Sequence, residues 1–315
     1  KRFLNFTGGF TYSKNTYSFA AAEVLVPHIL GSFYNYLPET TSWDSIKENS
    51  SLVVAFGGIP LKNGQINAGG LGSHEQREGI ESACKLGVNF INISPIKSDL
   101  HLKKSEWVKI NPNSDVALIL AIAFHLDKMK LVNHLFLQKY TVGYDKFINY
   151  VKGNVDGVLK DAKWASKITG INCKKILDLT EKIGKAERTM ISVSWSLTRQ
   201  DHGEQPFWAA ITLASMLGQI GLPGGGLGFG YSAVNSIGNN FTNIRGVSVP
   251  QGENKSGSFI PVARITDLLE KPNETFHYNG SEFTYPDIKL IYWAGGNPFH
   301  HHQDLNRMIK AWQKP

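Results

Sequence analysis

The sequence predicts an α/β protein that contains two related α/β units, with a parallel sheet in the first. The first observation is a local motif that occurs twice: residues 52–65 read LVVAFGGIPLKNGQ and residues 290–303 read LIYWAGGNPFHHHQ. The second is a pair of buried strand patterns at 51–56 and 88–94, which enclose a helical pattern at 74–86. A strand, a helix and a strand at this spacing form a βαβ unit with a parallel sheet.

Length and composition fit a folded globular protein. The 315 residues are 42% hydrophobic and 19% charged, which is ordinary globular usage, and they allow one to three domains. No stretch approaches the roughly 18 consecutive apolar residues of a membrane span, so we expect none. The net charge of +7 fits either a solvated basic surface or an anionic ligand such as a nucleotide, and because the lysines are scattered it favours nucleic acid less. The two cysteines, Cys84 and Cys173, cannot build an iron–sulfur site alone, and we expect two buried free thiols.

The N-terminal half begins without a clear pattern and then becomes helical. Residues 1–18 are rich in Gly, Thr, Tyr, Ser and Asn and lack a period, so we expect a loop. Residues 19–31 form a helical pattern in which Pro27 should kink or break the helix. After the βαβ unit, Ser114 or Asp115 is a natural N-cap for a strongly apolar helix. That helix covers residues 116–129, and further helices are expected around 133–139, 143–151, 161–168 and 173–185.

The C-terminal half is predicted to return to strands. A buried strand at 188–196 precedes an apolar helix at 204–218. PGGGLGFG at 223–230 follows that helix rather than a strand, so we interpret it as a helix stop and linker and not as a dinucleotide-binding loop. A long loop or crossover at 231–258 follows. We then expect a helix at 260–270, a last strand at 288–296 and a closing helix at 304–313. Because further strands normally follow such a strand and helix, the fold is expected to be incomplete at both ends.

A Gly-Gly-x-Pro turn follows the strand in each copy of the repeated motif. Aligned without gaps, Gly57-Gly58-Ile59-Pro60 falls on Gly295-Gly296-Asn297-Pro298. Glycine lets the backbone approach a ligand closely, and ligands of open α/β sheets bind beyond the carboxyl ends of strands. A single copy would favour a tight turn without a ligand. Two copies, each followed by a cationic or imidazole side chain, favour a phosphate or nucleotide ligand with two similar halves, or two similar ligands.

Two further polar segments follow predicted strands. In ISPIKSD at 93–99, Lys97 follows the carboxyl end of a predicted strand, where its ammonium group could bind phosphate. This segment alone is too short to assign a ligand. SWSLTRQDHGEQPFW at 194–208 is a dense polar run of the kind that lines a site. In this run, Arg199 could bind phosphate or an oxyanion, whereas His202 fits an acid and a satisfied surface histidine equally well.

Three adjacent histidines, His300 to His302, lie inside the second copy of the motif. Neighbouring residues point in different directions, and helical metal-ligand pairs are usually four residues apart. No second cluster of ligands supports a closed zinc site. The residues therefore do not favour zinc at this run.

Taken together, these segments resemble the molybdenum oxidoreductases that carry bis-molybdopterin guanine dinucleotide. The chain is most similar to the branch of dimethyl sulfoxide, trimethylamine N-oxide and biotin sulfoxide reductases, along essentially its whole length. The segments that carry the resemblance are FLNFTGGFTYS (3–13), SWSLTRQDHGEQPFW (194–208), MLGQIGLPGGGLG (216–228), IPVARITDLL (260–269) and YPDIKLIYWAGGNPFHHHQDLNRMIKAW (285–312).

The resemblance implies two open doubly wound parallel-sheet domains related by approximate twofold symmetry, which hold the two halves of the cofactor around one molybdenum. It implies a first cofactor-binding domain at 1–224 and the truncated start of a second at 225–315. Asp115 would accept hydrogen bonds from a guanine edge. The implied cofactor contacts are Lys62, Ser94, Pro95, Lys97, Asp115, Trp195, Ser196 and Arg199 in the first domain and Asn297, Pro298, His301 and Gln303 in the second.

The resemblance also implies a reductase that removes oxygen from S-oxides or N-oxides, with electrons from a cytochrome or another reductant. Arg199 is the catalytic candidate, because near the metal it could orient the S=O or N=O oxygen. The serine that holds molybdenum in this branch lies upstream of the segment that matches Lys1, so we expect no metal ligand here and no activity from this chain alone. A periplasmic location and a role in anaerobic respiration are family expectations. The alternative is a non-catalytic nucleotide-binding or assembly module from a split or decayed gene.

Overall fold

The fold is a mixed α/β fold whose largest sheet is parallel, as the sequence predicts. The structure, a computed structural model, describes residues 1–67, 71–242 and 246–315. In these ranges no helix is both long and apolar enough to cross a membrane. Cys84 and Cys173 are free thiols, as predicted, but both are only half-buried.

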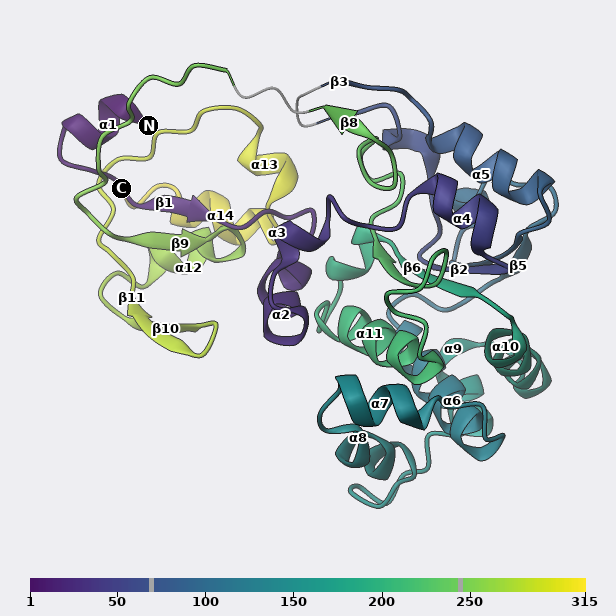
Figure 1. Cartoon of the computed structure of the whole chain (residues 1–315). Helices are drawn as coiled ribbons and strands as arrows, with labels where there is room; N and C mark the ends of the chain where they lie inside the picture. Colours follow the sequence, from purple (N-terminus) through teal and green to yellow (C-terminus); the bar gives the residue numbers. More distant parts are fainter. Residues whose placement is uncertain (68–70, 243–245) are drawn as a thin grey trace. The chain divides into compact units, whose positions relative to one another are not determined.

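Contacts divide the chain into two compact units (Figure 1). One unit is Ala21–Ile244, and the other joins Lys1–Ala20 with Arg245–Pro315. This division differs from the boundary expected after residue 224. The reason is strand pairing, since β7 (Gly226–Phe229) pairs inside the first unit and the N-terminal strand β1 (Tyr12–Lys14) pairs inside the second.

A five-stranded sheet forms the centre of the unit Ala21–Ile244. Its strand order is β5–β4–β2–β6–β7, and every pairing in it is parallel. All residues of β2 and β6 are buried, as expected for a parallel sheet covered on both faces. The strands are β2 (Leu52–Phe56), β4 (Asn89–Ile93), β5 (Glu106–Val108), β6 (Thr189–Val193) and β7 (Gly226–Phe229).

Helices cover both faces of this sheet, which makes it doubly wound. Figure 1 shows α4 and α5 on one side and α6, α10 and α11 on the other. On the first side, Trp43 and Ile80 share a hydrophobic core with Val53 of the central strand. On the second, α11 packs against β6 and β7, and α6 packs against α10 and α11. The bounds are α4 (Trp43–Asn49), α5 (Gln76–Lys85), α6 (Asp115–Lys128), α10 (Cys173–Lys185) and α11 (Gln205–Leu217).

The helix predicted at 19–31 is α2 (Ala20–Leu30), and it continues through Pro27. The helices predicted between residues 133 and 168 are also confirmed. The remaining elements of this part of the chain are α3 (Phe33–Tyr36), α7 (His134–Tyr140), α8 (Tyr144–Val151), α9 (Ala162–Thr169), the 3₁₀ helices η1 (Leu61–Asn63), η2 (Lys97–Asp99) and η3 (Trp195–Thr198), and the antiparallel pair β3 (Leu71–Gly72) and β8 (Phe241–Thr242).

The second unit is built around a small core of its own. Strand β1 pairs in parallel with β9, and β10 pairs with β11 as an antiparallel hairpin. Buried side chains of β9, α12, β10 and α14 form one hydrophobic cluster. The bounds are α1 (Arg2–Phe6), β9 (Phe259–Pro261), η4 (Val262–Arg264), α12 (Ile265–Glu270), β10 (Thr275–Tyr278), β11 (Ser281–Thr284), α13 (Pro298–His301) and α14 (Leu305–Ala311).

Two predictions about local structure are wrong for residues without a recognisable period. Residues 1–18 are not only loop, because they contain the short elements α1 and β1. Residues 223–230 are not only linker, because they contain the edge strand β7. At Gly228 a Cβ atom would lie 2.5 Å from Cε2 of the buried Tyr231 ring, so this packing requires glycine where a strand would normally carry a branched side chain.

The strand predicted at 288–296 is also wrong. The segment is irregular and pairs with no strand of the described chain. Leu290 and Tyr292 are 85% and 76% exposed, although their pattern is that of a buried strand. A strand requires hydrogen bonds from a neighbouring strand, so an apolar pattern alone does not produce one.

Candidate functional site

The strand order places a topological switch point between β2 and β6. The connection that leaves β2 leads to β4 on one side, whereas the connection that leaves β6 leads to β7 on the other side. In open α/β sheets, ligands bind in the crevice beyond the carboxyl ends of the strands at such a point. The turns after β2 and β6 are therefore the expected ligand-binding edge of this unit.

The turns after β2, β4 and β6 pack tightly against one another. The N–H of Gly57 donates to the carbonyl of Ile93 at 2.8 Å. Gly57 and Gly58 have φ angles of 77° and 73°, which favour glycine. A Cβ atom on Gly57 would lie 2.8 Å from Ser194 Cβ, and one on Gly58 would lie 2.5 Å from Asp99 Cβ. Packing within the protein thus accounts for both glycines of the first copy.

Ser94 is buried and shapes the turn after β4. Its hydroxyl donates to Asp99 Oδ2 at 2.6 Å and accepts from the N–H of Ile96 at 3.2 Å. Its carbonyl accepts a hydrogen bond from the indole N–H of Trp107 at 2.9 Å. These hydrogen bonds occupy the hydroxyl and the carbonyl of Ser94 inside the protein and fix the conformation of the turn.

Cationic side chains are exposed beside these turns. Lys62 lies in η1, which follows β2, and Lys97 begins η2, which follows β4. Both lysines and Pro95 are exposed. Within residues 1–67, 71–242 and 246–315, neither lysine forms an ion pair with a carboxylate. Both ammonium groups are thus available for an anionic ligand.

The segment after β6 forms the 3₁₀ helix η3 and carries three of the candidates. Ser194 Oγ caps it by accepting from the N–H of Ser196 at 3.3 Å and from the Ser196 hydroxyl at 2.9 Å. Ser196 and Arg199 are exposed, and Trp195 is half-buried. A Cβ atom on Gly230, which follows β7, would lie 1.9 Å from Trp195 Nε1, so glycine is required there to admit the indole.

Asp115 is the most unusual ionisable group at this edge. It is the first residue of α6, beyond the carboxyl end of β5, and only 3% of it is exposed. Burial raises the pKa of its carboxyl from 3.8 to about 6, against a smaller opposite effect of its own backbone N–H. In the described part of the chain no cation is paired with it. Ser114 is the N-cap residue of this helix, as predicted, but its hydroxyl donates to the Asn111 carbonyl at 2.6 Å and makes no capping hydrogen bond.

The structure places all the candidates of the first unit beyond the carboxyl ends of four neighbouring strands. Those strands are parallel, so their carboxyl ends share one edge of the sheet. This edge combines exposed cations, exposed hydroxyls and one buried carboxylate, which together suit a ligand with phosphates and hydrogen-bond donors. The contact role of each residue stays a prediction.

The second unit presents its candidates on and beside α13. Asn297 Oδ1 accepts from the N–H of Phe299 at 3.0 Å and caps this helix, and Gln303 Nε2 donates to the Ala263 carbonyl at 3.0 Å. Pro298 is half-buried and His301 is exposed.

The two glycines of the second copy lie in open surroundings. Gly295 and Gly296 have φ angles of 80° and 72°, as their counterparts do. A Cβ atom on Gly295 would meet nothing within 4 Å, and one on Gly296 would meet only Trp293 Nε1 at 3.9 Å. Unlike the first copy, the second leaves its glycine backbone free for the approach of another group.

His302, which the sequence did not single out, is the buried histidine of the run. Only 8% of it is exposed, whereas His300 and His301 are exposed. Its ring contacts Tyr17 Oη through Nδ1 and Thr266 Oγ1 through Nε2 at 2.8 Å. The run of histidines itself gives no signal of which member is buried, because that depends on how the short helix α13 is oriented.

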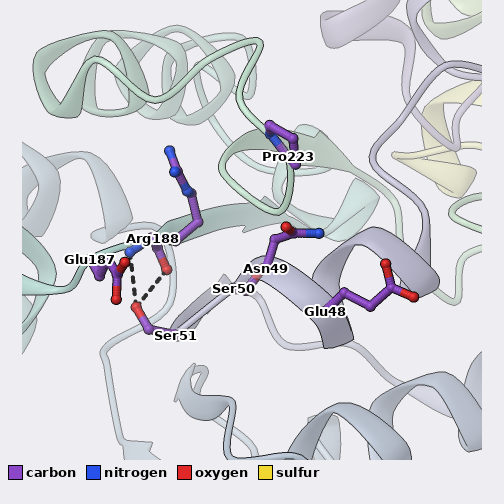
Figure 2. Close-up of a pocket in the computed structure, with 7 residues that line it drawn as sticks. All are labelled: Glu48, Asn49, Ser50, Ser51, Glu187, Arg188 and Pro223. Carbon is purple, nitrogen blue, oxygen red and sulfur yellow. Dashed lines mark hydrogen bonds between the residues drawn. The ribbon is translucent and has the colours of Figure 1, made fainter.

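A cavity of about 390 Å³ lies at the opposite edge of the sheet, at the amino ends of β2 and β6 (Figure 2). Ser51 Oγ donates to the Arg188 carbonyl and accepts from the Arg188 N–H, both at 2.9 Å. Two carboxylates and one guanidinium line it, so it offers no excess positive charge to an anion. The lining residues are Glu48, Asn49, Ser50, Ser51, Glu187, Arg188 and Pro223.

The described part of the chain contains no cluster of metal-ligating side chains. Among the described residues, no group of three or more His, Cys, Asp or Glu side chains could hold a metal ion.

Comparison with known proteins identifies relatives of the entire chain. A family model described as molybdopterin oxidoreductase matches residues 1–315. The chain is 44% identical over 316 residues to a biotin sulfoxide reductase from Cereibacter sphaeroides, covering 100% of this chain and 42% of that protein. It is 42% identical over 332 residues to a trimethylamine-N-oxide reductase from Haemophilus influenzae, covering 100% of this chain and 39% of that protein.

A third relative is a dimethyl sulfoxide/trimethylamine N-oxide reductase from Cereibacter sphaeroides. Identity to it is 39% over 325 residues, which cover 100% of this chain and 39% of that protein. The chain thus spans about two fifths of the length of the curated relatives it matches. Among solved structures, acetylene hydratase from Pelobacter acetylenicus aligns at a TM-score of 0.47 and 16% identity, over 64% of this chain and 25% of that one.

Proposed function

The chain belongs to the molybdopterin oxidoreductase family, and from this we propose that it is the central cofactor-binding part of a longer reductase that removes oxygen from S-oxides or N-oxides. One observation carries the proposal. Relatives whose names specify reduction of biotin sulfoxide, trimethylamine N-oxide or dimethyl sulfoxide match this chain from end to end. The net reaction would convert the oxide, two protons and two electrons into the reduced substrate and water.

Family membership implies a molybdenum–pterin cofactor, and the described residues fit a group of that chemistry. The open backbone at Gly295 and Gly296 leaves room for a planar ring or a phosphate. The uncompensated carboxylate of Asp115 needs hydrogen-bond donors, since a buried charge without a partner is unfavourable.

We propose the guanine dinucleotide form, bound in two copies. Asp115, which is mostly ionised at pH 7, can accept from the ring N–H and the amino group on the guanine edge. Lys62 and Lys97 are suited to the phosphates of one copy. The repeated Gly-Gly-x-Pro turn supports a second copy, for which Asn297, Pro298, His301 and Gln303 would be contacts.

The remaining candidates of the first unit would position the cofactor and the substrate. Pro95, Trp195 and Ser196 would contact the cofactor, and Ser94 would hold their turn in place. When bound, the cofactor supplies the oxygen-atom and electron-transfer chemistry. The exposed guanidinium of Arg199 would hold a phosphate or orient the S=O or N=O oxygen. We also propose a cytochrome or another reductant as electron donor, a periplasmic location and a role in anaerobic respiration, all supported by the resemblance.

The test uses the longer protein that contains this chain. Purified protein should contain molybdenum and release guanine nucleotide on acid hydrolysis, and it should reduce dimethyl sulfoxide, trimethylamine N-oxide or biotin sulfoxide with reduced benzyl viologen. The Asp115→Asn variant should lose bound guanine. The matched control is Asp145→Asn, which changes an exposed aspartate in the first turn of α8 and should retain bound guanine. Tight binding of guanine nucleotide without molybdenum or reductase activity would instead identify a non-catalytic nucleotide-binding module.

A further inference from the structure

A directional chain of hydrogen bonds runs through the buried ring of His302. Tyr17 Oη donates to the Val262 carbonyl at 3.0 Å and also contacts His302 Nδ1. Tyrosine has one hydroxyl proton, which the carbonyl takes because a carbonyl only accepts. The proton between Tyr17 and His302 therefore belongs to Nδ1. Nε2 then carries no proton and accepts from the Thr266 hydroxyl at 2.8 Å.

The surroundings of the ring keep it neutral. Burial lowers the pKa of His302 below its usual range, and the nearby Arg307 acts in the same direction, while Asp267 opposes it. Asp267 and Arg307 are themselves an ion pair, so much of their effect on the ring cancels. Burial also raises the pKa of Tyr17 to about 12, so its hydroxyl stays protonated. A proton on Nε2 would force the Thr266 hydroxyl to reverse and would bury a charge.

This network anchors a turn that is otherwise exposed. The N–H of His302 donates to the Pro298 carbonyl at 3.0 Å and closes the last turn of α13. The residues just before this helix, Tyr292 to Asn297, are all exposed. The ring connects the end of α13 to Thr266 of α12 and to Tyr17, which follows β1. Other packing at α13 comes from Phe299, whose ring lies 5.6 Å from that of Trp312.

We propose that His302 is a positioning residue, which in its neutral form with the proton on Nδ1 holds the Asn297–His301 turn in the conformation that binds the cofactor. The cofactor part of this inference rests on the proposed function, whereas the anchoring of the turn does not. A satisfied core histidine without such a role would stabilise the unit and leave both the turn and its ligand unchanged.

The test is hydrogen exchange of the backbone N–H groups of His300 to His302 in the longer protein, together with its guanine content. Tyr17→Phe keeps the ring but removes the acceptor for Nδ1–H. It should speed exchange in α13 about fivefold, as expected for one lost hydrogen bond, and reduce bound guanine. His302→Phe should do at least as much. His302→Asn should come close to the wild type at pH 7, because its amide nitrogen takes the place of Nδ1–H.

The pH profile and a control variant complete the test. Exchange in α13, corrected for its intrinsic rate, should accelerate in the wild type below the ordinary histidine pKa of about 6.5 and should not do so in His302→Asn. His277→Asn, which changes an exposed histidine of β10 in the same unit, should behave as the wild type. Unchanged exchange in Tyr17→Phe and His302→Phe would overturn the inference, and so would faster exchange with full guanine content. Wild-type protein without molybdenum or guanine would contradict the proposed function, while pH-dependent exchange would still establish the anchor.

Discussion

Asp115→Asn should make the ligand-free protein more stable at neutral pH. Burial raises the carboxyl pKa from 3.8 to about 6, so the folded state holds this proton more tightly than the unfolded state. Between these two values the folded protein binds more protons, and its stability must fall as the pH rises through this window. At pH 7 the carboxyl is ionised in both states, and the folded state bears the full cost of burying its charge. One pKa unit corresponds to about 1.4 kcal/mol, so this cost in folding stability is about 3 kcal/mol.

Asparagine has nearly the same shape as aspartate and carries no charge. We therefore expect Asp115→Asn and the wild type to have similar free energies of unfolding at pH 4. At pH 7 the variant should be more stable, by at most about 3 kcal/mol. Urea denaturation at pH 4, 5, 6 and 7 measures both proteins without adding salt. His302 contributes an opposite pH dependence, since its lowered pKa makes the fold less stable below about pH 6.5, but it is present in both proteins and cancels in the difference.

Two results would refute this reasoning. A variant that is less stable than the wild type at pH 7 would show that the carboxylate has a partner that compensates for its burial. A difference that does not change between pH 4 and pH 7 would show that its pKa is ordinary. Asp145→Asn should shift stability by no more than about 0.5 kcal/mol at every pH, because that side chain is exposed. A stabilised Asp115→Asn protein that has also lost guanine would show that the charge is kept for binding.

Four other predictions concern the turns that follow β2 and β4, the second Gly-Gly-x-Pro turn and the segment that precedes it. Gly58→Ala should destabilise the protein by at least about 2 kcal/mol in denaturation, because its Cβ would lie 2.5 Å from Asp99 Cβ at a positive φ. Gly295→Ala should lower the free energy of unfolding by only about 1 kcal/mol, yet it should also lower the guanine content. Equal destabilisation by Gly58→Ala and Gly295→Ala would contradict the difference between the two copies. Lys97→Glu should leave stability within about 0.5 kcal/mol and weaken binding of guanosine diphosphate, more at low salt than at high salt, whereas a salt-independent loss would exclude a charge effect. Residues 290–293 have the pattern of a buried strand but no partner within the described chain. In the longer protein we expect them to pair with another strand, so their backbone N–H groups should be protected from hydrogen exchange. Free exchange there would contradict this pairing.

Apolar runs and helical periodicity predicted the strands and helices that contribute to the core of the first unit. The strands at 52–56 and 89–93 and the helix between them follow from apolar runs and their spacing. Strand β7 was not predicted because GLGF has low strand propensity. Its glycines are explained only by the structure, since Gly228 packs against Tyr231 and Met190 and Gly226 has a φ angle of 90° beside Ile220. The segment 288–296 failed in the opposite way, since it has the pattern of a strand but no partner within the described chain.

The position of the candidate site was accessible from the sequence, whereas its electrostatics were not. Polar residues placed after predicted strands mark the edge of a parallel sheet, because those strand ends coincide in space. That Asp115 is 3% exposed and has no cation beside it depends on the packing of α6 against helices distant in sequence. The burial of His302 could not be predicted either, because this residue directly follows the exposed His301 at the end of the four-residue helix α13.

The two copies of the repeated turn have different surroundings, and from this difference we infer what occupies the space beside the second copy. In the first copy, Ser194 and Asp99 fill the space beside Gly57 and Gly58, so protein atoms satisfy the turn. In the second copy the same positive φ angles persist at Gly295 and Gly296 with almost nothing beside them. The positive φ angles favour glycine in both turns, but only in the first copy do neighbouring protein atoms also exclude a Cβ atom. The relatives are more than twice as long as this chain, so we expect either the bound cofactor or further parts of the longer protein to occupy that space.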